Sequence, residues 1–363
     1  MNDLRIYQIA LSQLQGIGPR KAIKLVSIGD EIERIFHDSI PQLSRKTGIR
    51  ESIIAQMKRE EAIERARLEV AFMEKNGIRV HYFLDDDYPR RLKQSSDAPI
   101  VIFSYGNVEM NPKRTVSVVG TRKATPYGFA LCQEFIQGVK DAEVQVISGL
   151  AYGIDICAHL ACVQQGTPTV AVLGHGLDRI YPSAHRKIAN KMVDNGGWIS
   201  EYLSGVTPER EHFPMRNRIV AGMSDAIVVV ESKDNGGSLI TASLGNDYQK
   251  DVFAFPGNVG QPQSEGCNQL IRENAAHLVT GSADFLKQMG WDQAPVKNKN
   301  LIDLNLDDNQ KCVIELIEDH PRIHIDALAI RSNLSIQQIN QVLIELELQQ
   351  IISSYPGNYY QRA

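Results

Sequence analysis

Apolar residues recur at helical spacing in the first part of the chain. In one charged stretch they fall at Ala62, Ala66, Val70 and Met73, which places them on one face of a helix. No strand pattern interrupts this spacing. The sequence therefore predicts a small helical domain over residues 1–76.

The pattern changes near Val80 to short apolar runs that alternate with amphipathic stretches. Strands separated in this way by helices are typical of a parallel sheet with helices on both faces. The sequence therefore predicts an α/β domain with a mostly parallel sheet over residues 77–290. Its expected strands are 100–104, 115–119, 144–147, 169–173, 226–230 and 252–254.

A stretch without a clear period, from Gln293 to Asn305, predicts a linker, which we place at 291–304. A third domain is expected over residues 305–363, and Ser335 and Gln338 form a capping box in it. Its expected elements are helices Asp308–Asp319, Ile325–Ile330 and Ser335–Gln350 and a hairpin that turns at Pro356-Gly357-Asn358. This order resembles a winged helix.

The charge of the third domain argues against contact with DNA. Between Asn300 and Ala363 there are nine acidic and four basic residues, so the rest of the chain is close to neutral. Helix Ser335–Gln350, which a winged helix usually presents to the major groove, has two Glu and no Lys or Arg. We therefore expect this domain to bind a protein partner.

The whole composition narrows the class of protein. A formal net charge of -4 means that any nucleic-acid site must be a local concentration of positive charge. Without a signal peptide or a long apolar segment, the chain is expected to be cytoplasmic, with no membrane insertion. Five cysteines without Cys-x-x-Cys spacing favour free thiols, and Cys157, His159 and Cys162 are better explained by burial than by metal ligation. We expect no metal and no cofactor.

Three loops of small residues follow expected strands. At the carboxyl ends of parallel strands, helix N-termini present backbone N–H groups to anions. The expected phosphate-binding residues are Gly120, Thr121, Arg122, Lys123, Ser148, Gly149, Gly236, Gly237 and Ser238. The first loop is not a dinucleotide fingerprint, because the next glycine after Gly120 is Gly128, which disfavours a dehydrogenase.

The most distinctive cluster runs from Phe213 to Arg218, just before an expected apolar helix at Ile219–Met223. An aromatic ring can stack on an unpaired base while guanidinium and amide groups hold phosphates, which suits single-stranded nucleic acid. The candidate contacts in this cluster are Phe213, Arg216, Asn217 and Arg218.

A structural alternative stays open for the same residues. Phe213 could lie in the core, and Arg216 and Arg218 could pair with acids such as Glu201 or Glu231. The cluster alone does not decide between the two.

Two further patterns have competing interpretations. The glycine turn of Leu14–Ala22 resembles a helix-hairpin-helix motif that could hold a phosphate, or it is only a tight packing turn. Its candidate contacts are Gly16, Gly18, Arg20 and Lys21. Asp155 and His159 could form a catalytic pair on one helix face, but capping by Asp155 and packing of His159 are favoured.

Five stretches of the α/β domain carry a family resemblance. They are Val119–Arg122, Ser148–Asp155 with Ala158-His159, Gly176–Pro182, Phe213–Gly222 and Gly237–Ala242. Together they resemble the DNA-processing protein A family (DprA, also called Smf), from about Asp85 to Leu286. One departure is Gln249-Lys250-Asp251, where family members commonly carry Gly-Arg.

The resemblance implies an extended Rossmann-like domain that binds single-stranded DNA and forms a homodimer. It also implies that the protein helps to load the RecA recombinase onto incoming strands during natural transformation. The ends of the chain are consistent with it, because this family often carries a sterile-alpha-motif-like or helix-hairpin-helix region and sometimes a winged helix.

Two other functions remain as alternatives. Phosphoribohydrolases with a related Rossmann-like fold use a Pro-Gly-Gly-x-Gly-Thr-x-x-Glu helix start, whereas Asn235–Ser243 has no Glu and so lacks the obvious acid-base group. A pure scaffold, in which only the acidic third domain recruits a partner, is the other alternative. We predict a DNA-binding protein that is not an enzyme.

Overall fold

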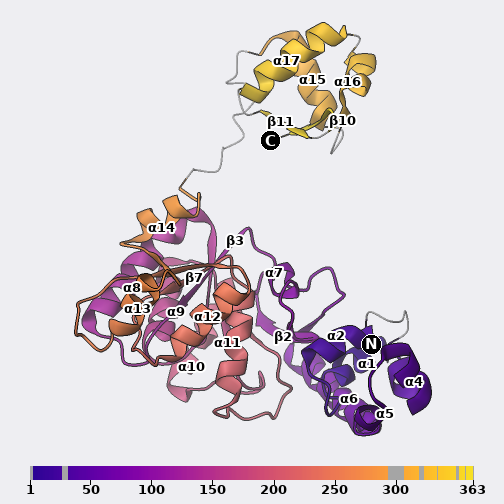
Figure 1. Cartoon of the computed structure of the whole chain (residues 1–363), viewed down its shortest axis with the longest axis vertical. Coiled ribbons are helices and arrows are strands. Elements are labelled where there is room, and N and C mark those ends of the chain that lie inside the picture. The colour runs from indigo at the N-terminus through magenta and orange to yellow at the C-terminus, as the bar shows by residue number, and fades with distance from the viewer. Residues whose placement is uncertain are drawn as a thin grey trace. The chain divides into compact units, whose positions relative to one another are not determined.

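The structure is a computed structural model that forms two compact units, Met1–Asp292 and Gln293–Ala363, which we describe separately (Figure 1). The residues it describes are 3–26, 32–292, 306–318, 323–332, 334–348, 351–355 and 357–362. The linker placed at 291–304 therefore lies outside the described residues, except for Trp291 and Asp292.

The first part of the chain is helical, as its periodicity predicts. Its helices are α1 (Asp3–Leu11), α2 (Pro19–Val26), α3 (Arg34–His37), α4 (Ile40–Thr47), α5 (Glu51–Ile54) and α6 (Arg59–Asn76). In α6, Ala62, Ala66 and Met73 are buried, and the helix ends at Gly77, whose φ of 67° suits a left-handed C-cap. These helices share one core with Val101, Phe103 and other residues of the adjoining sheet.

A sheet of nine strands follows, in the order β1-β2-β6-β5-β4-β3-β7-β8-β9. Its strands are β1 (Arg79–Tyr82), β2 (Val101–Gly106), β3 (Arg114–Val119), β4 (Val144–Ser148), β5 (Thr169–Leu173), β6 (Gly196–Ser200), β7 (Ala226–Val229), β8 (Asp251–Ala254) and β9 (His277–Leu278). Strands β3 to β9 pair in parallel, whereas β2 pairs antiparallel with both β1 and β6. The prediction of a mostly parallel sheet is confirmed.

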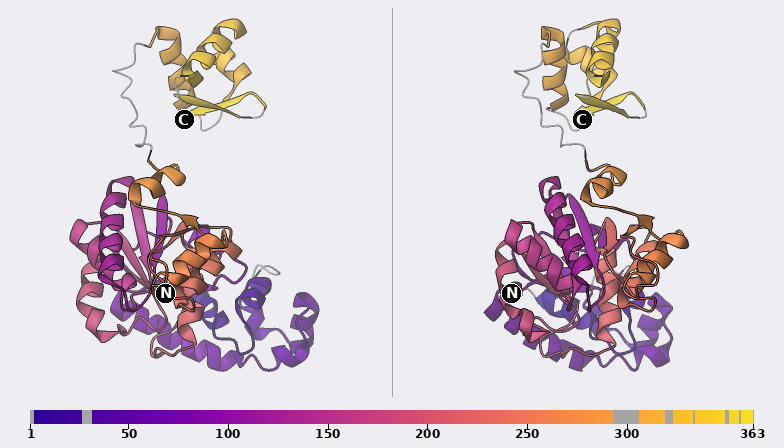
Figure 2. Two further views of the ribbon diagram at one scale, coloured as in Figure 1. Left: turned by 60° about the vertical axis from the view of Figure 1, so that its left-hand side comes forward. Right: turned by 90° about the vertical axis from the view of Figure 1, so that its left-hand side faces the viewer.

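Helices cover both faces of this sheet, as the two views in Figure 2 show. On one face α11 (His212–Gly222), α12 (Gly237–Asp247) and α13 (Glu265–Arg272) pack on side chains such as Val170 and Val229. On the other face, α8 (Pro126–Val139), α9 (Ile154–Gln165), α10 (Arg186–Met192) and α14 (Ser282–Gln288) pack on the alternate residues. A short helix, α7 (Arg90–Lys93), and the 3-10 turns Lys140–Ala142, Ser183–His185 and Val193–Asn195 complete the unit.

One predicted boundary is wrong. The whole of Phe213–Arg218 lies inside α11, which begins at His212, and not in a loop before a helix at Ile219. Pro214 is compatible with this helix, because a proline in the first turn removes only an N–H group that has no partner within the helix. The cluster is therefore held on a helix, and its side chains face different ways.

The second unit has the elements of a winged helix. They are α15 (Asp308–Glu318), β10 (Ile323–His324), α16 (Ile325–Ser332), α17 (Ile336–Leu348), β11 (Ile352–Tyr355) and β12 (Tyr359–Arg362). The strands form an antiparallel sheet in the order β10-β12-β11. The predicted capping box is present, because Gln338 Oε1 accepts from Ser335 N and Gln338 N donates to Ser335 Oγ (3.0 and 3.3 Å). Expected residues Asp319, Gln349, Gln350 and Pro356 lie outside the described residues.

No helix among the described residues is both long and apolar enough to cross a bilayer. Those same residues also contain no group of three or more His, Cys, Asp or Glu placed to hold a metal ion.

Candidate nucleic-acid interface

The predicted loops meet at one edge of the sheet, where β3, β4, β5 and β7 end. The chain builds outward from β3 in one direction through β4 and β5, and then returns to place β7 on the other side of β3. Such a reversal of strand order opens a crevice at the carboxyl ends of the strands. Thr121 joins the loops there, because its N–H donates to Glu231 O (2.7 Å) and its carbonyl accepts from Ile154 N (3.3 Å).

An exposed cation and aromatic rings form a cluster at this edge. The guanidinium carbon of Arg122 lies 5.5 Å from the centre of the Phe213 ring, and the Tyr181 ring lies 6.0 Å from Phe213. Arg122 is exposed, Tyr181 is half-exposed at 49%, and Phe213 is half-buried. We call Arg122, Phe213 and Tyr181 the edge cluster.

Tyr181 was not among the site residues expected from the sequence. It stands in the loop after β5, within the family-like stretch Gly176–Pro182. An aromatic residue in a loop that directly follows a predicted strand was the available signal for it, because such loops gather at the carboxyl edge.

Arg216 does not line an open groove, which corrects the expectation from sequence. Its side chain is only 4% exposed, and its Nη1 donates to the carbonyls of Gly149 (2.5 Å) and Val172. Burial lowers the pKa of the Arg216 guanidinium, and the charge of Asp155 opposes that shift. Since a guanidinium stays protonated in proteins, a positive charge is fixed beneath the loop that follows β4.

Arg218 is also buried, and here the structural alternative is the one observed. Its Nη2 donates to Glu201, and its Nη1 donates to Asp97 O (2.5 Å). Glu231, the other suggested partner, instead accepts from the N–H and the hydroxyl of Thr125 at the start of α8 (2.8 and 2.5 Å). Arg218 therefore positions α11 and has no exposed donor face for a phosphate.

Ser148 and Gly149 form hydrogen bonds inside the protein, which corrects the expectation that they donate to a phosphate. The fully buried hydroxyl of Ser148 donates to Val118 O (2.7 Å), and Gly149 N donates to Asp155 Oδ2 (3.2 Å). Gly149 is required for packing, since a Cβ there would lie 2.2 Å from Arg216 Nη1. These residues hold Arg216 in place.

The N-terminus of α12 is the clearest place for a direct phosphate contact. Gly236 is its N-cap, and a Cβ at the exposed Gly237 would meet nothing within 4 Å. The Ser238 side chain is buried and its hydroxyl donates to Ser232 Oγ (2.8 Å), so only its backbone N–H is available. Backbone N–H groups in the first turn have no partner within the helix and attract anions.

The other expected contacts are dispersed. Lys123 is exposed beside Arg122, while half-buried Asn217 accepts from Arg216 Nε (3.1 Å). In the helical part, Arg20 and Lys21 are exposed at the start of α2, where Arg20 donates to Ser96 Oγ (3.2 Å) and Lys21 donates to Gly16 O (3.0 Å). Gly16 takes a positive φ of 76°, whereas Gly18 does not. A DNA contact at this turn stays a prediction.

Asp155 and His159 are both buried in α9, as the favoured interpretation expected. Asp155 accepts from Gly149 N and Ala151 N (3.2 and 3.4 Å), and His159 bonds Thr169 Oγ1 through Nδ1 (2.8 Å). Burial raises the pKa of Asp155, and Arg216 opposes this shift. Burial lowers the pKa of His159 to about 3.

Replacing His159 by Gln is expected to make stability less sensitive to acid. In the unfolded chain the imidazole titrates near 6.5, whereas the folded-state pKa of His159 is about 3. Between these values the unfolded state binds a proton that the folded state does not, so the free energy of unfolding falls by up to about 1.4 kcal/mol for each pH unit. Urea denaturation from about pH 7.5 down to about pH 4.5 should show a shallower fall for the variant. An equal fall in both proteins would contradict this.

Two family models match the chain. The model described as DNA recombination-mediator protein A matches residues 79–290, more than half of the chain. The model described as DprA winged helix domain matches residues 301–358.

Full-length relatives give the same result. The DNA processing protein DprA of Streptococcus pneumoniae is 35% identical over 283 residues, which cover 78% of this chain and 97% of that protein. Protein Smf of Escherichia coli is 33% identical over 290 residues, which cover 77% of each chain.

Two solved structures share the fold. The X-ray structure of the Streptococcus pneumoniae protein aligns with a TM-score of 0.66 and 32% identity, over 79% of this chain and 98% of that chain. A structure that addresses the single-stranded DNA binding mode of DNA processing protein A from Helicobacter pylori aligns with a TM-score of 0.54 and 25% identity, over 59% of this chain and 96% of that chain. The chain therefore belongs to the DNA recombination-mediator protein A family of DNA-processing proteins, whose members are also named DprA and Smf.

Proposed function

We propose that the carboxyl edge of the sheet binds single-stranded DNA without sequence preference. Bases stack on Phe213 and Tyr181, while Arg122, Lys123 and the N-terminus of α12 hold phosphates. The observation that carries this proposal is the position of exposed Arg122 over the Phe213 ring, at 5.5 Å, in a loop at the strand ends. Stacking on aromatic rings beside cations is the usual way in which proteins bind single strands without reading their sequence.

The chemistry of the edge favours a single strand over a duplex. A ring can stack only on a base whose face is free, and a duplex hides its base faces. The relative from Helicobacter pylori, for which a single-stranded DNA binding mode is described, aligns over 59% of this chain and supports this choice.

Buried Arg216 strengthens the attraction for phosphate without touching it. Within the described ranges Arg216 takes part in none of the ion pairs, and its bonds go to two carbonyls and to Asn217. A charge in a region of low dielectric constant is screened less than one in water. Its field, reduced by the nearby Asp155 carboxylate, adds to that of Arg122 and Lys123 at the edge.

We propose binding without catalysis. The residues that could have formed an acid-base pair are closed off, because Asp155 is 7% exposed and His159 is fully buried. Each is bonded to the protein interior, which supports a structural role.

We extend the proposal to loading of the RecA recombinase during natural transformation, by a homodimer in the cytoplasm. Membership of the recombination-mediator family supports this extension. ATP hydrolysis by RecA on a limiting single strand should rise when the protein is added, and sedimentation should give twice the mass of the chain. If ATP hydrolysis does not rise, the proposal of RecA loading is wrong, and if the mass is that of one chain, the proposal of a homodimer is wrong.

We also propose a protein partner for the acidic winged-helix unit, because α17 carries two Glu and no Lys or Arg.

Substituting the edge cluster tests the binding proposal. Arg122→Ala and Phe213→Ala are each expected to weaken binding of an oligo-dT strand by about tenfold. Arg122→Ala removes a cation that binds a phosphate, and Phe213→Ala removes a ring on which a base stacks. Fluorescence anisotropy across a salt series measures the effect, with the matched duplex as a second ligand.

Lys140→Ala is the matched control. Lys140 is exposed and begins the 3-10 turn Lys140–Ala142 that precedes β4, so it lies at the opposite, amino-terminal edge of the strands. The Lys140→Ala variant should bind the oligo-dT strand with unchanged affinity. Equal affinity for strand and duplex, or unchanged affinity in both edge variants, would overturn the site.

A further inference from the structure

Two cysteines face each other where α8 and α9 pack together on the sheet (Figure 1). Cys132 Sγ of α8 lies 3.9 Å from the carbonyl oxygen of Ile154 in α9. Cys157 Sγ of α9 lies 3.7 Å from the carbonyl oxygen of Phe129 in α8. In a helix, a side chain lies over the preceding turn, near the carbonyl three residues back. Ile154 is three residues before Cys157, and Phe129 is three residues before Cys132, so the two sulfur atoms lie on facing turns, next to each other.

The pair has the chemistry of a dithiol that can be oxidised. A hydrogen bond between the two thiols lowers the pKa of Cys157 and raises that of Cys132. The thiolate is the form that reacts with oxidants, so Cys157 reacts first. Cys157 is also 6% exposed, whereas Cys132 is fully buried. A second thiol beside a reactive one favours a disulfide over further oxidation of the first.

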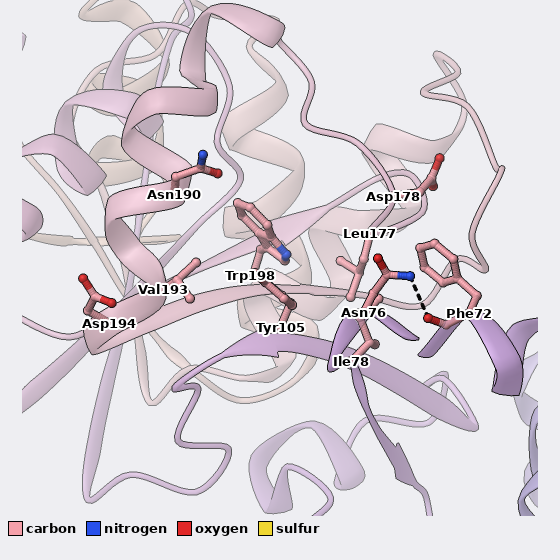
Figure 3. Close-up of a pocket in the computed structure, with 10 residues that line it drawn as sticks. All are labelled: Phe72, Asn76, Ile78, Tyr105, Leu177, Asp178, Asn190, Val193, Asp194 and Trp198. Carbon is pink, nitrogen blue, oxygen red and sulfur yellow. Dashed lines mark hydrogen bonds between the residues drawn. The ribbon is translucent and has the colours of Figure 1, made fainter. Parts of the chain in front are cut away.

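An oxidant reaches the pair from the protein surface. None of the described residues that line the cavity of about 420 Å³ between α6, β2, β6 and α10 is a cysteine, so this cavity gives no path to the pair (Figure 3). Phe129, whose carbonyl oxygen contacts Cys157, is 38% exposed. Because Cys157 itself has only a small exposed area, hydrogen peroxide is favoured over a bulky oxidant such as glutathione disulfide.

The first turn of α9 packs directly on the loop that carries Arg122. Ile154 N donates to Thr121 O (3.3 Å). In the same turn, Cys157 N donates to Gly153 O (3.1 Å). Gly153 has a positive φ of 78°, and a Cβ there would lie 2.1 Å from Thr121 O and 2.8 Å from Arg122 Cα. A displacement of Cys157 and its turn is therefore transmitted to Arg122.

We propose that Cys132 and Cys157 form a reversible disulfide with hydrogen peroxide as the oxidant, and that this bond weakens DNA binding at the edge cluster. The Cys157 thiolate attacks one peroxide oxygen, the O–O bond breaks, and the leaving hydroxide takes up a proton to give water. The Cys132 sulfur then attacks the sulfur of the Cys157 sulfenic acid. The S–S bond forms, the S–O bond breaks, and a second water leaves with the Cys132 proton. The two thiols thus lose two electrons and two protons, which reduce one peroxide to two waters.

Closing the bond draws the first turns of α8 and α9 together. A disulfide holds its sulfur atoms about 2.05 Å apart, which is shorter than any contact between unbonded thiols. Because the turn of Cys157 packs on the Arg122 backbone, Arg122 moves relative to Phe213. The affinity for an oligo-dT strand should fall about fivefold, less than when the Arg122 side chain is removed. This effect on DNA rests on the proposed function, whereas formation of the disulfide does not.

Counting thiols in the full chain tests the bond. All five cysteines lie among the described residues and are free thiols. After peroxide treatment, maleimide in denaturant should label two fewer thiols, and dithiothreitol should restore the lost two. Peptide mass spectrometry should place the link between Cys132 and Cys157. Cys162→Ala removes another buried thiol of α9 and is the matched control, which should still form the link.

Anisotropy with oligo-dT tests the effect on DNA binding. The oxidised parent chain should bind about fivefold more weakly than the reduced chain, and dithiothreitol should restore its affinity. Cys157→Ala and Cys132→Ala, each checked for folding by circular dichroism, should bind with the same affinity before and after peroxide treatment. Cys162→Ala should respond to peroxide like the parent.

Several results would overturn the proposal. An unchanged number of labelled thiols, a link to a different cysteine, or Cys157 sulfinic acid beside a free Cys132 would each rule out the disulfide. Unchanged affinity of the oxidised chain would rule out its effect on DNA. If the reduced chain does not bind oligo-dT, the proposed function and the effect on DNA both fail, while the thiol count still decides whether the bond forms.

Discussion

Gly149→Ala is expected to weaken binding of an oligo-dT strand by roughly a hundredfold, more than any single surface substitution. A Cβ at this position would lie 2.2 Å from Arg216 Nη1 and 2.4 Å from its Cζ. The guanidinium cannot move aside without losing its bonds to Gly149 O and Val172 O. Either the guanidinium or the loop after β4 must therefore shift, and in both cases the charge beneath the edge cluster is displaced.

The control for this variant is a glycine in open space. Gly281→Ala places a Cβ that meets nothing within 4 Å, on extended backbone with a φ of 175°. It should bind oligo-dT like the parent chain in the same anisotropy assay. If Gly149→Ala keeps the circular dichroism spectrum of the parent and also its affinity, Arg216 and its loop have no part in binding.

Glu201→Ala is expected to lower the free energy of unfolding by about 3–5 kcal/mol, as removal of one partner from a buried ion pair does. Arg218 is 4% exposed, and its Nε already lacks a hydrogen-bond partner. Burial raises the pKa of Glu201, and the Arg218 charge opposes that shift. Without Glu201 the guanidinium would be a buried charge with no counter-charge.

Urea denaturation measures this effect, with an exposed pair as the control. Glu61→Ala removes the partner of Lys58 from a pair whose side chains are 70% and 55% exposed, and should cost at most about 1 kcal/mol. The double variant Glu201→Leu with Arg218→Met should be more stable than Glu201→Ala, because it leaves no unpaired charge. A loss below about 1 kcal/mol for Glu201→Ala would contradict the role given to the pair.

The apolar runs predicted six strands of the sheet, but they did not predict β1, β9 or β6, which lies between β2 and β5. That strand begins with Gly196-Gly197, two residues that normally weaken a strand assignment. In the fold they are required, because Cβ atoms there would lie 2.0 Å from Thr169 O and from Tyr105 O on the neighbouring strands. A close approach of backbones is a tertiary fact that local patterning does not encode.

The sequence located the site better than it assigned its residues. Strand-end loops can be found from patterning, because parallel strands end at one edge. The tertiary structure decides which hydrogen-bond donors remain free at this edge. Ser148 and Arg216 face inward, whereas Arg122 and Tyr181 face outward. Arg216 and Arg218 indicated phosphate binding, yet both side chains donate hydrogen bonds to buried carbonyl groups, and that of Arg218 also donates to a carboxylate.

The core that the helical part shares with the edge strands also bears on how this chain can change over time. Ile9, Ala66 and Met73 pack in one cluster with Val101 and Phe103 of β2, so neither side has a complete interior by itself. The boundary near position 77 separates kinds of secondary structure and not independent modules. Substitutions on one side must therefore be matched on the other, and the two parts are expected to diverge as a pair and to be inherited together.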